Sequence, residues 1–140
     1  DYEEGNWTPR ISGTGGGEYT PGASNRGLYT KVGRIVTVSA TIQWTSSVTP
    51  YSGLFAITGL PYAALNLSDY RAGGIFPSQA VGVYASGGFN KLNVGVDPNQ
   101  SIAYVVMTSD TITSGSNYSH FPNVNAAGTI YGFTLTYITN

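Results

Sequence analysis

The segment Arg34–Trp44 alternates between apolar and polar side chains for most of its length. Its apolar positions are Val36, Val38, Ala40, Ile42 and Trp44, and its polar positions are Thr37, Ser39, Thr41 and Gln43. Successive side chains of a β-strand point to opposite faces of a sheet, whereas one face of a helix repeats every three to four residues. The pattern therefore predicts a strand with one buried side and one outward-facing side.

A second alternating segment, Gly128–Ile138, has aromatic and aliphatic residues on one face and threonines on the other. Shorter apolar segments predict further strands at Trp7–Ile11, Leu28–Lys31, Phe55–Thr58, Ala80–Tyr84, Lys91–Val96 and Ile102–Thr108. Glycine, proline and asparagine separate these segments, and we expect a loop over Ser12–Arg26, which contains five glycines. Many short strands without helical periodicity predict a single-domain antiparallel β-sandwich, for which we expect a tumour-necrosis-factor-like jelly roll.

Composition limits the classes of function. The 140 residues suit one domain, residues 1–140, and only 9% of them are charged, against roughly 25% in an ordinary soluble protein. The six basic residues are scattered and the net charge is −1, so we expect no nucleic-acid partner. The apolar segments are too short to predict membrane insertion, and the absence of cysteine excludes disulfides and thiolate metal sites.

Three segments of the first half carry a resemblance. Asp1–Pro9 reads DYEEGNWTP, Gly27–Val38 reads GLYTKVGRIVTV, and Ile57–Tyr62 reads ITGLPY. In this order they resemble blocks of the C-terminal β-domains of bacteriophage tail fibres and tailspikes. The second half shares only its β character with those domains.

The resemblance implies a homotrimer at the exposed tip of a phage tail, within the virion. It also implies that Asp1–Pro9 joins the domain to a preceding trimeric shaft or enzymatic body, and we expect the chain to be a C-terminal fragment of such a protein. In that segment we expect Tyr2 and Trp7 to anchor the chain, Gly5 to turn it and Pro9 to occupy a sheet edge. The structural motif residues are Tyr2, Glu3, Glu4, Gly5, Trp7, Thr8, Pro9, Tyr29, Lys31, Gly33, Gly59, Leu60 and Pro61.

Catalysis is not predicted. Glu3 and Glu4 are adjacent, so on an extended segment they point to opposite sides and cannot flank one bond as a catalytic pair. His120 is the only histidine, no G-x-S-x-G nucleophile elbow is present, and the chain has too few ligands for a zinc site. We therefore predict no enzyme, no metal and no cofactor, and we expect any depolymerase active site of the parent protein upstream of Asp1.

Two loops are candidates for glycan contact. Tyrosines in predicted loops, among them Tyr19, Tyr51 and Tyr62, can stack on sugar rings or pack against a neighbouring subunit. The loops with the most polar neighbours contain Asp69, Tyr70 and Arg71, and Asn117, Tyr118 and His120. Three roles stay open: a trimerisation and receptor-binding domain, a carbohydrate-binding module that recognises a host cell-surface polysaccharide, and a head-fibre or capsid decoration domain.

Overall fold

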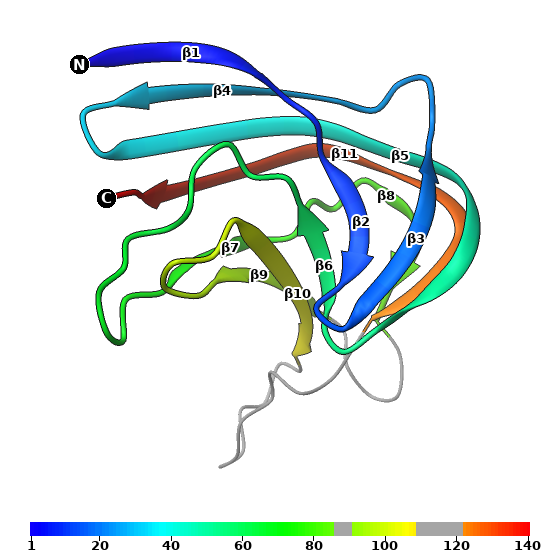
Figure 1. The fold of residues 1–140 in the computed structure, drawn as a ribbon. Helices are drawn as coiled ribbons and strands as arrows, with labels where there is room; N and C mark the ends of the chain where they lie inside the picture. Colours follow the sequence, from blue (N-terminus) through cyan, green and yellow to red (C-terminus); the bar gives the residue numbers. More distant parts are fainter. Residues whose placement is uncertain (86–90, 109–121) are drawn as a thin grey trace.

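The computed structural model describes residues 1–85, 91–108 and 122–140, which form two antiparallel β-sheets (Figure 1). Sheet A contains, in spatial order, β1 (Tyr2–Trp7), β4 (Arg26–Val32), β5 (Ile35–Ser52), β11 (Asn123–Ile138) and β8 (Ala80–Tyr84), and β3 (Gly16–Pro21) also pairs with β5. Sheet B contains β2 (Arg10–Gly13), β6 (Phe55–Thr58), β10 (Ile102–Thr108), β9 (Lys91–Val96) and β7 (Ala72–Ile75). The prediction of an all-β fold with two antiparallel sheets is confirmed. No helix long and apolar enough to cross a membrane occurs within the described ranges.

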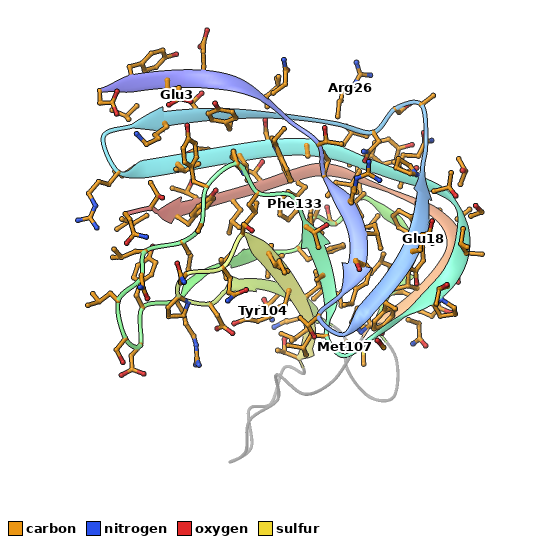
Figure 2. The ribbon with its side chains drawn as sticks, in the orientation of Figure 1. Glu3, Glu18, Arg26, Tyr104, Met107 and Phe133 are labelled. Atoms are coloured by element: carbon orange, nitrogen blue, oxygen red, sulfur yellow. The ribbon has the colours of Figure 1, made fainter. Side chains whose placement is uncertain are left out.

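The hydrophobic core lies between the two sheets. The apolar positions of the alternating pattern in β5 point into it and are buried: Val36, Val38, Ala40, Ile42 and Trp44. They meet buried residues of β11 and of sheet B, including Phe133, Leu135, Tyr137, Ile57 and Val105. Figure 2 shows Phe133 between the sheets. Removing these apolar surfaces from water is the main favourable contribution to folding.

The chain crosses from one sheet to the other at Thr8 and Pro9, where the sequence predicted one strand over Trp7–Ile11. This prediction is wrong, because β1 ends at Trp7 in sheet A and β2 begins at Arg10 in sheet B. Pro9 has no N–H to continue a hydrogen-bond ladder, and its ring is buried at the crossing rather than placed on a sheet edge. The interruption lets one continuous segment tie the two sheets together.

The region Ser12–Arg26 is not the loop that the sequence predicted. It contains the end of β2, a tight turn and β3, which pairs with the far half of β5. Gly17 lies so close to this partner that a Cβ atom there would be 2.7 Å from Tyr51 Cα. The glycines therefore permit close strand contact instead of forming a loop.

Tyr19 and Tyr51 belong to strands and not to loops. Tyr19 lies in β3 and is buried, and Tyr51 lies in β5 and packs against the core. The hydroxyl of Tyr19 accepts a hydrogen bond from Tyr51 N at 3.1 Å, and the Tyr51 hydroxyl donates to Pro122 O at 2.7 Å. Burial makes the Tyr19 ring unavailable for stacking on a sugar, and the partly buried Tyr51 ring packs against Phe55 with centroids 5.3 Å apart.

Both chain termini lie at the same end of the sandwich, beside the β4–β5 turn (Figure 1). Gly33 N donates a hydrogen bond to Asp1 O, and Thr139 N donates one to Arg34 O, each at 2.8 Å. The N-terminal strand β1 is the edge strand of sheet A, and its position determines where the candidate site forms.

Candidate functional site

The three sequence blocks meet at the carboxylate of Glu3. Tyr29, from the second block, donates its hydroxyl hydrogen to Glu3 Oε1 at 2.7 Å. Tyr62, from the third block, donates to the same oxygen in a short hydrogen bond. The two tyrosine rings contact each other edge to face, with centroids 5.6 Å apart. We call Glu3, Tyr29, Tyr62, Lys31 and Asp1 the Glu3 cluster.

The pairing of β1 with β4 places these side chains on one face. Gly5 is directly opposite Tyr29, and Glu3 is opposite Lys31. A Cβ atom on Gly5 would lie 2.8 Å from Tyr29 Cε1, so the missing side chain at Gly5 makes room for the tyrosine ring. The expectation that Gly5 turns the chain is wrong, since Gly5 lies within β1.

Glu3 and Glu4 point to opposite faces of the sheet, as the sequence predicted. Glu3 faces Tyr29 and Tyr62, whereas Glu4 accepts a hydrogen bond from the Tyr2 hydroxyl at 2.7 Å on the outer face. Tyr2 is 65% exposed, so it does not anchor the chain by burial as expected. The two carboxylates therefore do not form a pair around one site.

The hydrogen bonds of the Glu3 cluster stabilise the ionised carboxylate. The hydroxyl of Tyr62 contributes most to lowering the pKa of Glu3, followed by the hydroxyl of Tyr29, and the charge of Lys31 acts in the same direction. The same hydrogen bond to Glu3 raises the pKa of Tyr62. Lys31 Nζ is 2.8 Å from Asp1 Oδ2 and 5.7 Å from the centroid of the Tyr62 ring. These polar groups interact mainly with one another, which suits a structural contact better than a catalytic one.

The rest of the first block is fixed by burial. Trp7 is buried, and its Nε1 donates to Leu28 O at 3.1 Å and to Ser39 O at 3.3 Å. The carbonyl of Thr8 lies against Gly59 of the third block, where a Cβ atom would approach Thr8 O to 2.5 Å.

The remaining block residues have structural positions. Leu60 is buried, and Pro61, half-buried, leads into Tyr62, whose N–H and C=O both bond the hydroxyl of Tyr137. Gly33 forms the β4–β5 turn with φ of 59°. The close approach of Thr8 to Gly59 also joins blocks one and three outside the Glu3 cluster.

The first predicted glycan loop lies at the end that carries the termini. The Tyr70 hydroxyl accepts a hydrogen bond from Ile138 N at 2.9 Å, so this group is engaged by the C-terminal strand. Asp69 is exposed, with φ of 63°, and Arg71 Nε is 3.0 Å from Asp97 Oδ1. The second loop, with Asn117, Tyr118 and His120, lies outside the described residues.

Two residues near Arg71 were not predicted from the sequence. Asp97, at the end of β9, and Tyr104, in β10, lie close together, with Tyr104 Oη 3.5 Å from Asp97 Oδ1. Both line a small hollow of about 150 Å³. The sequence contains no signal for this contact, because Asp97 fits a turn and Tyr104 fits a strand equally well without it. Guanidinium, carboxylate and phenol groups together can bind sugar hydroxyls.

Comparisons of the chain with known protein families, with curated proteins and with solved structures find no significant match. No group of three or more histidine or acidic residues that could hold a metal ion occurs within the described part of the chain. A functional assignment therefore depends on the three sequence blocks and on the geometry around Glu3.

Proposed function

We propose that the chain is a non-catalytic terminal domain of a phage tail fibre or tailspike, assembled as a homotrimer with subunits of the jelly-roll type. The meeting of the three blocks at Glu3 carries this proposal. Glu3 is 26 residues from Tyr29 and 59 residues from Tyr62 in the sequence, yet one carboxylate oxygen accepts hydrogen bonds from both. Blocks that resemble those of phage domains thus form one structural unit in this chain.

This structural unit attaches the N-terminal strand β1 to the domain, as the terminal domain of a fibre requires. The Glu3 cluster, Trp7 and the contact of Thr8 with Gly59 attach β1 to the rest of the domain at several points. A terminal domain needs such an attachment, because the incoming chain then holds the domain in a defined orientation. Any preceding part of the protein would join at Asp1, beside the C-terminus.

The geometry favours structure over glycan binding as the main role. The Asp69–Arg71 loop lies near the termini, since Tyr70 bonds to Ile138. In the proposed fibre this end faces the preceding body, and the receptor-binding tip is the opposite end. Contact with a host polysaccharide is a second role, which in the proposed fibre falls to the opposite end of the domain and not to the Asp69–Arg71 loop.

The experiment is incubation of the 140-residue chain with purified bacterial surface polysaccharides, with binding and cleavage measured separately. Binding to a polysaccharide without release of oligosaccharides supports a receptor-binding domain. If none of the polysaccharides binds, the domain has a structural role only. Release of oligosaccharides would overturn the proposal, because no active site is proposed within this chain.

A further inference from the structure

The outer face of sheet A, which points away from sheet B, exposes a continuous row of apolar side chains. The strand register places Tyr2 opposite Val32, Val32 opposite Ile35, and Ile35 opposite Ile138. Residues directly opposite each other in antiparallel strands share a face, so these four form one row across β1, β4, β5 and β11. Val32 is 57% exposed and Ile35 is 53% exposed. Such a row is unusual on the solvent side of a sheet, where polar residues are expected.

Leu28 forms a second apolar feature of this face. It is 59% exposed and lies between two hollows, both of which it lines. One hollow, of about 270 Å³, extends over Ser39 and Gly132, and the other, of about 430 Å³, extends over Glu4 and Asn6. A protruding side chain beside two hollows provides the relief that a packed interface needs.

The polar part of the face can be buried at low cost. A row of threonines lies between Leu28 and the apolar row that contains Val32. In it, Thr30 is opposite Thr37, and Thr37 is opposite Thr136. The hydroxyls of Thr37 and Thr136 are 3.0 Å apart and bond to each other. A hydroxyl with a partner loses little when water is removed, whereas an unpaired one is costly to bury.

Only two charged side chains point outward from the described strands β1, β4, β5 and β11. They are Glu4 and Arg26, because Glu3 and Lys31 lie on the other face. Figure 2 shows Arg26 pointing away from sheet B. Arg26 is four positions along β4 from Thr30, the partner of Glu4 on the neighbouring strand, so the two side chains start about 14 Å apart. Neither takes part in an ion pair within the described residues.

We propose that the outer face of sheet A is the surface through which each subunit contacts other copies of the same chain around the trimer axis. This inference rests on the proposed homotrimer and names its contact surface. The face combines exposed aliphatic side chains, a hydrogen-bonded pair of threonines (Thr37 and Thr136) and one charge of each sign. A second copy supplies the complement to each of these features, with Glu4 of one subunit near Arg26 of the next.

The position of β1 supports this choice of partner. The face begins at β1, through which any preceding chain would enter the domain. When the outer faces of three subunits surround one axis, the three incoming chains lie close together, as they must after a trimeric shaft. Heterologous contacts of this type close into a ring when three copies are related by a threefold axis.

The test compares two valine substitutions in the 140-residue chain. Val32→Glu introduces a charge into the apolar row. The control, Val48→Glu, introduces the same charge at another exposed valine, which belongs to β5. Val48 is 62% exposed and lies beyond the part of β5 that pairs with β4 and β11. Solution mass is measured by sedimentation velocity, and folding by circular dichroism. We expect the Val32→Glu chain to fall to the monomer mass, a threefold loss, and the Val48→Glu chain to keep the wild-type mass.

The outcomes separate this inference from the proposed function. A Val32→Glu chain that keeps the trimer mass overturns the assignment of the face but leaves the homotrimer intact. A wild-type chain of monomer mass overturns both. A wild-type dimer that Val32→Glu dissociates supports the face as a self-association surface and overturns the homotrimer.

A charge exchange keeps the inference testable if Val32→Glu fails to fold. Glu4→Arg and Arg26→Glu each affect an exposed side chain, so folding should survive. Each single variant should raise the trimer dissociation constant at least tenfold, and the double variant should restore most of the affinity. Single variants that assemble like the wild type would overturn the inference.

Discussion

The hydroxyl of Tyr29 donates a hydrogen bond to Glu3 Oε1 across 2.7 Å, connecting the edge strand β1 to its neighbour β4 on the face that β1 turns toward sheet B. Tyr62 donates to the same oxygen from the segment that follows β6 of sheet B. One carboxylate therefore holds together the start of the chain, sheet A and a connection to sheet B. Its ionisation should influence the stability of the N-terminal strand.

Acid should remove this stabilisation. Because hydrogen bonds from Tyr62 and Tyr29 lower the pKa of Glu3 below its ordinary value of 4.5, the stabilisation is present above pH 4.5 and is lost as the pH falls through the lowered pKa. We expect the wild-type chain to have a higher melting temperature than Glu3→Gln at pH 7. The difference should shrink as the pH is lowered below 4.5. A melting-temperature difference that is independent of pH would show that Glu3 does not act through its charge.

Trp7→Ala should lower the free energy of unfolding by roughly 3 kcal/mol, because it empties a buried site and leaves two carbonyl acceptors without the indole donor. Urea titration followed by circular dichroism measures the change. The control is Ile75→Ala, a substitution of an exposed side chain in β7 of sheet B, for which we expect a change within about 0.5 kcal/mol. Equal stability of the two variants would contradict the anchoring role of Trp7.

Gly59→Ala should destabilise the domain more than Gly73→Ala. Gly59 has φ of 88°, and a Cβ atom there would lie 2.5 Å from Thr8 O, so alanine adds both backbone strain and a clash. We expect a cost on the order of 1–3 kcal/mol. At Gly73 the nearest atom to a Cβ is Val94 O at 3.5 Å, an ordinary contact. Denaturant unfolding measures the loss of stability in both variants. A smaller loss for Gly59→Ala than for Gly73→Ala would disprove the close contact between blocks one and three.

Tyr70 and Arg71 should behave differently although they are neighbours. Tyr70→Phe removes the acceptor for Ile138 N and should cost about 1 kcal/mol of stability without changing glycan binding. Arg71→Ala breaks an exposed ion pair with Asp97, which should alter stability by less than about 1 kcal/mol. If this loop contacts a polysaccharide, Arg71→Ala should weaken binding. Loss of binding on Tyr70→Phe alone would contradict the structural role of its hydroxyl.

Local sequence patterns predicted those strands that are short apolar segments with turn residues at both ends. The bounds of β6, β8, β9 and β10 agree with those predicted, because each is a short apolar segment between clear turn signals. β5 continues to Ser52, well beyond the predicted end at Trp44, since its far half is polar and is held by pairing with β3. β7 was missed because Gly73 and Gly74 give no pattern, and pairing with β9 alone makes this segment a strand.

The candidate site was only partly predictable for a similar reason. Adjacent positions in a strand determine that Glu3 and Glu4 face opposite ways, and this followed from the sequence. The tyrosines that bond to Glu3 come from other strands and connections, so their positions depend on sheet order and register. The contact of Arg71 with Asp97 spans 26 residues of sequence and likewise leaves no local signal.

The most direct test of the homotrimer is the solution mass of the wild-type 140-residue chain, measured by light scattering at several concentrations. One chain has a mass of 14.7 kDa, so the proposal predicts about 44 kDa, three times that value. A mass of 14.7 kDa at every concentration would contradict the account, and the exposed face of sheet A would then have to be explained without other copies of the chain.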